Sequence, residues 1–268
     1  MACWGSGVDH QEVLALFDRQ MRRDSRSETP STHMEWDGPV LRHVGGRKDW
    51  NAVVWSELDE DGADAAIAAQ VRFFAGLGVE FEWKLYGHDR PADLGERLLA
   101  AGFAAEERET LMVGAVGDMR LSTELPDGVR LERVTDAAGV ELMARASERA
   151  FGENADWLRH RVLKQLAEEP ENAHPFVVLA GDEPVSSARM DVYPGTDFVG
   201  LWGGGTAPEW RGKGIYRALV AERARIAADL GYRYLQVDAT DQSRPILSRL
   251  GFAALSTTTP YLMAAPGN

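Results

Sequence analysis

The residues best placed to do chemistry form the turn Arg211-Gly212-Lys213-Gly214, because an amphipathic segment that predicts a helix follows it directly. The N-terminus of a helix presents unpaired backbone N–H groups and a partial positive charge, and glycines let an anion approach the backbone closely. Arg211 and Lys213 add full positive charges at the same point. We therefore predict a site for a phosphate or pyrophosphate group; the alternative is a glycine turn whose basic side chains lie in solvent.

The helix after this turn is predicted to end at Gly231, since glycine favours helix C-termini. Four apolar residues are assigned to its buried face: Ile215, Leu219, Ile226 and Leu230. Five polar residues are predicted to face away from that side: Arg217, Glu222, Arg223, Arg225 and Asp229. The glycines of the turn then mark the N-terminal end of the helix.

Two common phosphate-binding loops do not fit this turn. A Walker loop, G-x-x-x-x-G-K-[ST], needs a hydroxyl after its lysine, but Gly214 follows Lys213 and Ala207 stands at the first glycine position. A dinucleotide-binding fingerprint, G-x-G-x-x-G, needs a third glycine where this chain has Arg217. The turn must therefore belong to another kind of phosphate site.

Composition excludes several classes of partner. The 268 residues include 29 Lys and Arg against 42 Asp and Glu, and the net charge of −13 argues against nucleic acid. The single cysteine, Cys3, excludes an intramolecular disulfide, a cysteine zinc cluster and CxxC redox chemistry. The N-terminal stretch lacks the pattern of a signal peptide, and no apolar run approaches membrane-spanning length. We expect a cytoplasmic protein with no membrane partner.

The histidines do not predict a metal site. The sequence has no HExxH motif, no nucleophile elbow and no clustered histidines. His160 follows Asp156 by four residues, which supplies only two of the ligands that a metal needs. His174 falls in a proline-containing turn and is expected to lie in solvent.

Two stretches, Gly76–Phe103 and Asp229–Phe252, share one order of features. Each has a helix that ends at Leu-Gly, a strand, a polar turn with Arg-Pro, a short leucine-rich helix and Gly-Phe, and each is followed by a closing strand. The polar stretch Gly117–Gly128 separates two related halves. The C-terminal half predicts one strand, two helices near 137–150 and 155–167, three strands, then helix, strand, helix and strand.

The turn, written Arg211-Gly212-Lys213-Gly214-Ile215-Tyr216 and introduced by Pro208, resembles the pyrophosphate loop [QR]-x-x-G-x-[GA] of the GCN5-related N-acetyltransferases, the GNAT family. The resemblance extends over roughly 128–263, including the strand before the loop and the segment "SRPILSRLGF". It implies an α/β (α+β) fold with a mixed, mostly antiparallel central sheet flanked by helices, in two tandem units. We expect a catalytic N-acetyltransferase domain at 117–268.

The N-terminal half, residues 1–116, resembles only the later part of that fold. Asp59, Glu60 and Asp61 stand where the basic loop would be, so carboxylates would face a pyrophosphate. We therefore expect a degenerate GNAT-like unit that binds no acyl-CoA.

The resemblance implies that acetyl-CoA is the co-substrate, with no metal, and that an acceptor amine attacks the thioester directly in a ternary complex. Cys3 is then not needed as a nucleophile. The residues that the resemblance assigns to acetyl-CoA are Gly204, Gly205, Thr206, Arg211, Gly212, Lys213, Gly214, Ile215, Tyr216 and Ser243. A backbone N–H among the glycines of "LWGGGT" would polarise the thioester oxygen. An ordinary glycine bulge with no ligand is the alternative for these glycines.

The sequence departs from the family pattern at three positions. Tyr216 stands where the loop usually has Gly or Ala, so its ring must point away from the phosphates or cover them. Leu247 falls where many members have a tyrosine that donates a proton, and the strand "FVGLWGG" lacks a glutamate that often acts as base. These gaps keep open a second function, a non-catalytic acyl-CoA-binding or regulatory module.

The general base must then come from elsewhere, or the amine must arrive neutral and lose its proton to water. The candidates are Glu153 between the two helices, Asp191 at the end of "SARMDV" and Tyr261 on the closing strand. Each also has a structural interpretation, as a solvated or capping loop charge, a hairpin-end charge and a core residue respectively. Trp157, Trp202 and Trp210 are candidates to line the acceptor site, although they suit a core as well. We expect a monomer or homodimer with an amine-bearing acceptor.

Overall fold

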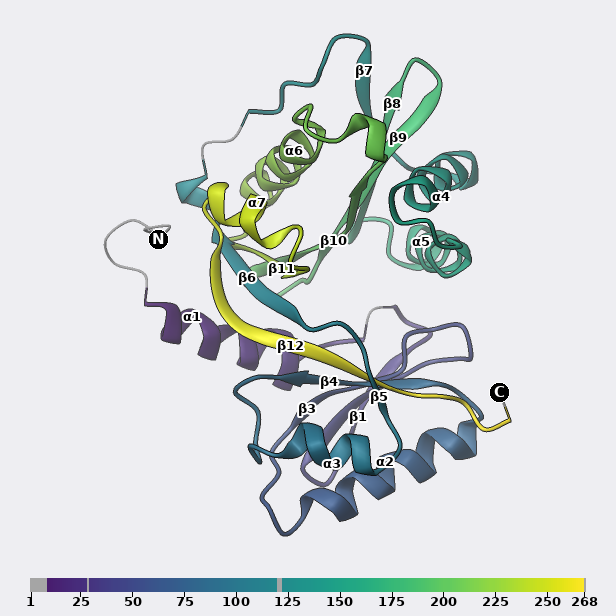
Figure 1. Ribbon diagram of the computed structural model, residues 1–268, viewed down its shortest axis with the longest axis vertical. Coiled ribbons are helices and arrows are strands. Elements are labelled where there is room, and N and C mark those ends of the chain that lie inside the picture. The colour runs from purple at the N-terminus through teal and green to yellow at the C-terminus, as the bar shows by residue number, and fades with distance from the viewer. Residues whose placement is uncertain (1–8, 28, 120–121, 268) are drawn as a thin grey trace. The chain divides into compact units, whose positions relative to one another are not determined.

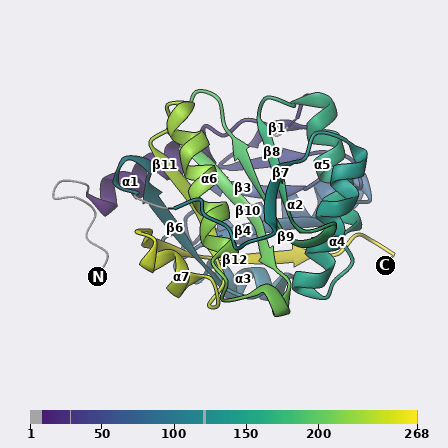
Figure 2. The same cartoon turned by 90° about the horizontal axis from the view of Figure 1, so that it is seen from above.

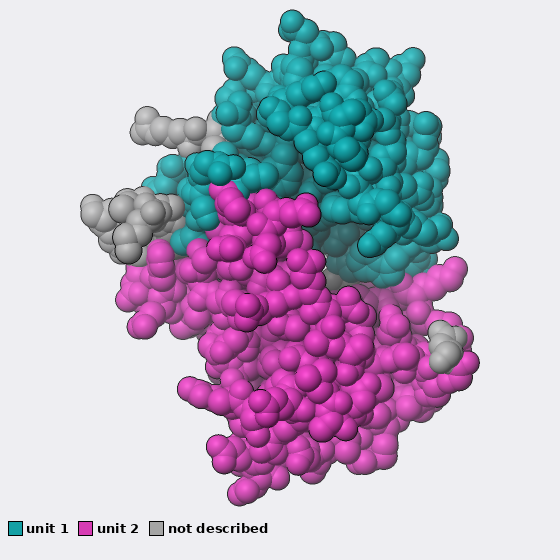
Figure 3. Space-filling model, viewed as in Figure 1, with its two compact units in different colours: residues 1–7, 113–237, 246–253 teal, residues 8–112, 238–245, 254–268 magenta. Residues whose placement is uncertain are grey.

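The computed structural model describes residues 9–27, 29–119 and 122–267, and it divides into two compact units (Figure 3). Unit 1 contains Val113–Val237 and Ile246–Ala253, and unit 2 contains Val8–Met112, Asp238–Pro245 and Ala254–Asn268. The chain therefore passes between the units more than once, and its C-terminal segment is part of unit 2. The sequence boundary between 1–116 and 117–268 stays a prediction. Cys3 lies outside the described residues.

The described residues form 12 strands and seven α-helices (Figure 1). The strands of unit 1 are β7 (Val129–Arg133), β8 (Ala173–Ala180), β9 (Glu183–Val192), β10 (Phe198–Thr206) and β11 (Tyr234–Ala239). Neighbours from β7 to β10 pair antiparallel, whereas β10 and β11 pair parallel. This arrangement confirms the predicted mixed, mostly antiparallel sheet.

Helices cover both faces of the unit 1 sheet (Figures 1 and 2). Val177 and Leu179 of β8 pack with residues of α4 (Ala137–Phe151) and α5 (Asp156–Glu168). The alternate residues Phe176 and Val178 pack with α6 (Ile215–Asp229) instead. Because successive side chains of a strand point to opposite faces, α4 and α5 lie on one side of the sheet and α6 on the other.

The structure confirms where α6 begins and corrects its predicted faces. The helix starts at Ile215 and Gly231 follows its end with a φ of 82°. Arg223, predicted to face solvent, is only 1% exposed, and Leu230, predicted to be buried, is 51% exposed. The buried arc of α6 is wider than the apolar residues alone indicate, because small residues such as Ala218, Ala221 and Ala227 let the helix sit close to the sheet.

Most of the remaining elements belong to unit 2. They are α1 (His10–Phe17), η1 (Asp18–Arg23), β1 (His33–Asp37), β2 (Val40–Val44), β3 (Ala52–Ser56), α2 (Ala63–Leu77), β4 (Phe81–Tyr86), α3 (Leu94–Ala100), β5 (Ala104–Ala105), β6 (Glu109–Ala115), η2 (Val116–Asp118), η3 (Pro208–Trp210), α7 (Arg244–Arg249) and β12 (Ala253–Met263), of which η2, η3 and most of α7 lie in unit 1. In unit 2, β3 and β4 form a parallel pair joined through α2, and β12 pairs antiparallel with β4. Both units therefore contain a strand, helix and parallel strand in succession.

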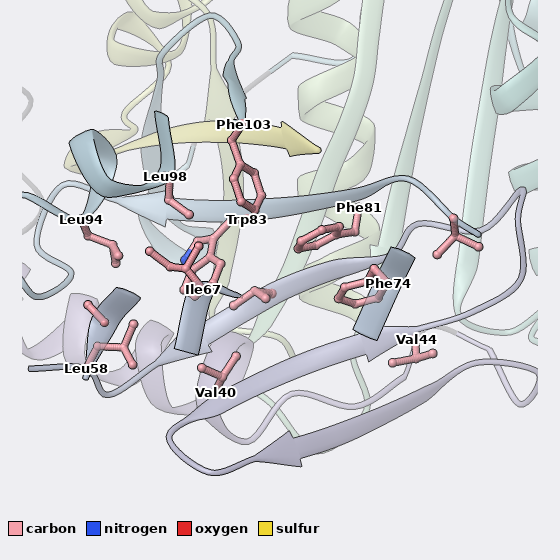
Figure 4. Packing of buried hydrophobic residues seen from close by; sticks show 13 residues of the cluster. Val40, Val44, Leu58, Ile67, Phe74, Phe81, Trp83, Leu94, Leu98 and Phe103 are labelled. Carbon is pink, nitrogen blue, oxygen red and sulfur yellow. The ribbon is translucent and has the colours of Figure 1, made fainter. Parts of the chain in front are cut away.

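Unit 2 has a well-packed aromatic core (Figure 4). Phe74 of α2 stacks on Phe81 of β4 with ring centroids 4.2 Å apart, and Phe103 meets Phe81 edge-on at 5.3 Å. Trp83 and Leu98 complete the same layer. In the part of the chain that the structure describes, no helix is long and apolar enough to cross a membrane.

The Phe74→Ala variant should lose about 3–5 kcal/mol of unfolding free energy, because it removes a fully buried ring and leaves a cavity. Leu77→Ala, on the same helix but exposed, is the matched control and should change stability little. Urea unfolding followed by circular dichroism measures both. Similar losses in the two variants would contradict the assignment of Phe74 to the core.

Candidate functional site

The strands β10 and β11 part within unit 1. Their parallel register runs from Phe198 opposite Tyr234 to Gly200 opposite Gln236, and it ends there although β10 continues to Thr206. On its other edge β10 stays paired with β9, but the register shifts between Trp202 and Gly205. The end of β10 therefore has a bulge and lacks a parallel neighbour in register.

A steric reason explains why each of the three positions at this end of β10 is a glycine. Gly203 has a φ of 58°, in the left-handed region that favours glycine. A Cβ on Gly204 would lie 2.9 Å from Cε2 of Tyr216, and a Cβ on Gly205 would lie 2.5 Å from Cζ of Phe151. Side chains from α6 and α4 thus approach the bare backbone of β10 from its two faces.

The predicted phosphate turn connects the end of β10 to the start of α6. Gly212 has a φ of 74° and Gly214, the residue that precedes the helix, has a φ of 86°. A Cβ on Gly212 would meet nothing within 4 Å. No side chain among the described residues caps the N-terminus of α6. The first amides of the helix are therefore available to an anion.

The basic side chains beside the turn are held by the protein. Arg211 donates from Nε to the carbonyl of Thr206 at 3.0 Å and from Nη2 to the carbonyl of Ala150 at 2.9 Å. Its guanidinium thus ties the turn to β10 and to the end of α4. Lys213 places its Nζ 4.2 Å from the ring centroid of Trp210, in a cation–π contact. Both positive charges stay close to the turn.

Tyr216 points toward the strand. Its ring lies beside Gly204, and burial raises the pKa of its hydroxyl. The ring therefore occupies the space that a side chain at Gly204 would take, between α6 and β10. Ile215, the neighbouring residue assigned to the loop, is buried against β8 and β9 residues of the core.

Of the three candidate bases, Asp191 lies in the unit 1 sheet. It is 4% exposed and sits on β9 directly opposite Gly200, the last residue of β10 in register with β11. Its Oδ2 accepts a hydrogen bond from Nε of Arg189 at 3.2 Å and lies 3.6 Å from Nη2 of Arg161. Its Oδ1 has no hydrogen-bond partner among the described residues. Asp191 is therefore a buried carboxylate with one oxygen still able to accept a proton or hydrogen bond.

The other two candidates lie elsewhere. Glu153 is exposed in the loop between α4 and α5. Tyr261 belongs to unit 2, where it packs against the aromatic core and its hydroxyl lies 2.5 Å from the position of a Cβ on Gly95. Their proposed catalytic roles stay predictions.

Of the residues around Asp191, Arg161, Arg189 and Tyr193 were not predicted from the sequence, whereas Trp157 and Trp202 were candidates to line the acceptor site. The guanidinium of Arg189 lies 5.8 Å from the ring centroid of Trp157 and 5.9 Å from that of Trp202, and Arg161 lies 5.1 Å from Trp157. Trp202 donates its Nε1 hydrogen to the hydroxyl of Tyr193 at 3.2 Å. The alternation in "SARMDV" places Arg189 on the same face as Asp191, so this contact was detectable in principle.

The remaining residues named in the sequence analysis have contacts or burial typical of ordinary structural residues. Ser243, assigned to acetyl-CoA, belongs to unit 2 and its hydroxyl lies 3.3 Å from that of Thr240. Leu247 is fully buried and has no proton to donate. His174 corrects a prediction: it lies in β8, nearly buried, and burial lowers its pKa. Within the described residues, no group of three or more potential ligands could hold a metal ion.

Comparison with known proteins supports the resemblance. Residues 138–252 match the model of the Acetyltransferase (GNAT) family. A GCN5-related N-acetyltransferase from Kribbella flavida aligns with a TM-score of 0.69 and 19% identity over 98% of each chain. One from Sphaerobacter thermophilus aligns with a TM-score of 0.60 and 16% identity, over 86% of this chain and 78% of its own.

A tandem GNAT protein from the clavulanic acid biosynthesis pathway also aligns, with a TM-score of 0.59 and 12% identity, over 90% of this chain and 86% of its own. No curated protein matched the sequence. The expected fold is confirmed by these structures, and their coverage includes both units. Residues 138–252 are therefore a domain of the acetyltransferase (GNAT) family, and the chain as a whole has the fold of GCN5-related N-acetyltransferases.

Proposed function

We propose that unit 1 transfers an acetyl group from acetyl-CoA to the amine of an acceptor by direct attack in a ternary complex. The observation that best supports this function is the uncapped N-terminus of α6 beside the parted end of β10. The first feature offers amides to a pyrophosphate, and the second leaves strand backbone unpaired beside it. Both belong to the segment that matches the family model.

The donor would be held mainly by backbone groups. The positive φ values of Gly212 and Gly214 turn the chain so that amides from Gly212 to Tyr216 lead into the helix N-terminus. Arg211 keeps this turn fixed through its two carbonyl contacts, and Lys213 supplies charge beside it. A diphosphate fits this donor set, because it gains several charge-assisted hydrogen bonds without a metal.

The acetyl carbonyl would lie at the bulge of β10. An unpaired N–H in the stretch Gly203–Gly205 would donate to the thioester oxygen as negative charge develops there. The amine nitrogen attacks the carbonyl carbon, a new C–N bond forms, and collapse of the tetrahedral intermediate breaks the C–S bond. The CoA thiolate leaves and takes its proton from water, since Leu247 cannot supply one.

Asp191 is the base that we propose. Its Oδ1 is free to accept the proton that the amine loses, while Arg189 and Arg161 hold Oδ2 in place. The position opposite Gly200 sets this carboxylate at the point where β10 and β11 part. Trp157 and Trp202 lie in the same cluster and are proposed to contact the acceptor.

Unit 2 is proposed to bind no donor. Its α2 occupies the place between parallel strands that α6 occupies in unit 1. In front of α2, however, the Asp59 carboxylate accepts a hydrogen bond from the amide of Gly62 at 2.7 Å. The Asp59 carboxylate therefore occupies an amide that a phosphate would need at the N-terminal end of α2. Glu60 and Asp61 add negative charges there, which would repel a phosphate.

Release of free thiol from acetyl-CoA, assayed across a panel of amines, is the test of the proposed function. Turnover that depends on the amine is the expected result, together with a mass increase of the acceptor and no acetylated enzyme. Binding of acetyl-CoA without turnover for any amine would instead favour the acyl-CoA-binding or regulatory module. No binding of acetyl-CoA would refute both functions.

Gly214→Asp should weaken acetyl-CoA binding by about ten- to a hundredfold relative to Gly214→Asn, because it adds a negative charge at the anion site. Asparagine has nearly the same shape and tolerates a positive φ, so the pair separates charge from backbone strain. Calorimetric titration measures both variants, and the unaltered protein should bind one acetyl-CoA per chain. Equal affinities for the two variants, or two sites per chain, would contradict the assignment.

Asp191→Asn should lower kcat by about 10²- to 10⁴-fold at neutral pH while acetyl-CoA affinity stays the same, because the amide cannot accept the amine proton. Raising the pH should reduce the difference in kcat between Asp191→Asn and the unaltered enzyme, since a larger fraction of the amine is then neutral. Asp182→Asn, in the exposed turn between β8 and β9, is the matched control. A folded Asp191→Asn enzyme with unchanged kcat, or a deficit independent of pH, would show that Asp191 is not the base.

A further inference from the structure

Arg223 is a buried cation in the middle of α6. Its side chain donates from Nε to the carbonyl of Leu219 at 3.0 Å and from Nη1 to the carbonyl of Arg189 at 3.1 Å. Burial lowers the pKa of Arg223, although the guanidinium stays protonated at neutral pH. Arg225, two residues later, is exposed and pairs with Glu222 and Asp229 instead.

No carboxylate among the described residues forms an ion pair with Arg223. Among the described residues, the ionisable group that influences the pKa of Arg223 is the hydroxyl of Tyr216, which carries no charge at neutral pH because burial raises its own pKa. Burying a charge without a counter-ion costs folding free energy. A protein with an apolar side chain of similar volume at such a position is often at least as stable as one with the charged side chain. Stability alone therefore does not account for an arginine at this position.

The guanidinium lies beneath the bulge of β10. Arg189, whose carbonyl it contacts, pairs with Trp202, the last residue of β10 in register before the bulge. Nη2 of Arg223 lies 3.8 Å from the position that a Cβ on Gly204 would take. The positive charge, carried by a residue of α6, is therefore next to the bulged backbone of β10.

We propose that Arg223 is a positioning residue for acetyl transfer, which fixes the bulge of β10 and strengthens the electrostatic pull of its amides on the thioester oxygen. This inference rests on the proposed function. The hydrogen bond to Arg189 holds the strand opposite the bulge, and the unneutralised charge favours negative charge that develops on the far side of the same peptide groups. Arg223 itself does not touch the reacting atoms.

The carbonyl stretch of acetyl-CoA labelled with ¹³C at the carbonyl tests this inference directly. Bound to the unaltered protein, this infrared band should shift to lower frequency than in solution, because the carbonyl is polarised. In Arg223→Met the shift should shrink while the dissociation constant changes less than about threefold, since the pyrophosphate turn is untouched. Arg225→Met, which removes an exposed charge from the same helix, should keep the full shift.

Steady-state kinetics give the second measurement. Arg223→Met should lower kcat by about ten- to a hundredfold, less than loss of a direct oxyanion donor, with little change in the KM for acetyl-CoA. Arg223→Lys keeps the charge and should recover part of both kcat and the infrared shift. It also serves as the test variant should Arg223→Met fail to fold.

The outcomes separate the inference from the function on which it rests. An unaltered protein that does not bind acetyl-CoA overturns both. Binding with the same carbonyl shift in the unaltered protein and in Arg223→Met overturns the inference and leaves the function standing. Equal losses in the Lys and Met variants also overturn it, because the charge would then have no part in the effect.

Discussion

A parallel pair of strands inside a mostly antiparallel sheet is the constraint on which the unit 1 site depends. Antiparallel neighbours can be joined by a tight turn, as β8 and β9 are, but parallel neighbours need a crossover. Here the crossover is α6, and it must begin near the end of β10 at which the chain leaves the sheet. The connectivity of the chain thus brings the amides of the helix N-terminus next to the unpaired backbone of the strand, whatever side chains these segments carry.

The same connectivity in unit 2 shows how little of the function the fold determines. There β3, α2 and β4 repeat the arrangement, with Ala52 and Val53 in parallel register with Glu82 and Trp83. The residues before the helix decide the chemistry: Gly212 and Gly214 leave the amides of α6 accessible, whereas Asp59 accepts a hydrogen bond from Gly62 at the start of α2. One scaffold therefore presents an anion site in one unit and an acidic turn in the other.

The parts of the structure that depend on neighbouring residues in sequence could be predicted. The turn at Gly212 and Gly214, the start of α6 and the strands around it follow from glycine positions and hydrophobic periodicity. The burial of Arg223 and His174 could not be predicted, because it depends on contacts with backbone and strands that are distant in the sequence. Hydrophobic periodicity does not contain information on such contacts. The surroundings of Asp191 required three separate elements, since Arg161 comes from α5 and Trp202 from β10. The return of the C-terminal strand β12 to pair with β4 likewise depends on contacts far apart in the chain.

The departure of Tyr216 from the family's small residue has a physical account in the opposing strand. A large side chain at this position of α6 needs space next to β10, and Gly204 provides it by having no Cβ. The ring and the guanidinium of Arg223 then share the layer between helix and bulge, where the ring helps to exclude water from the charge. Exclusion of water strengthens the field of a fixed charge at short range. The loss of a small residue in the loop and the presence of a buried arginine are therefore parts of one arrangement, in which the helix supports the strand backbone from behind while the amides in front stay accessible.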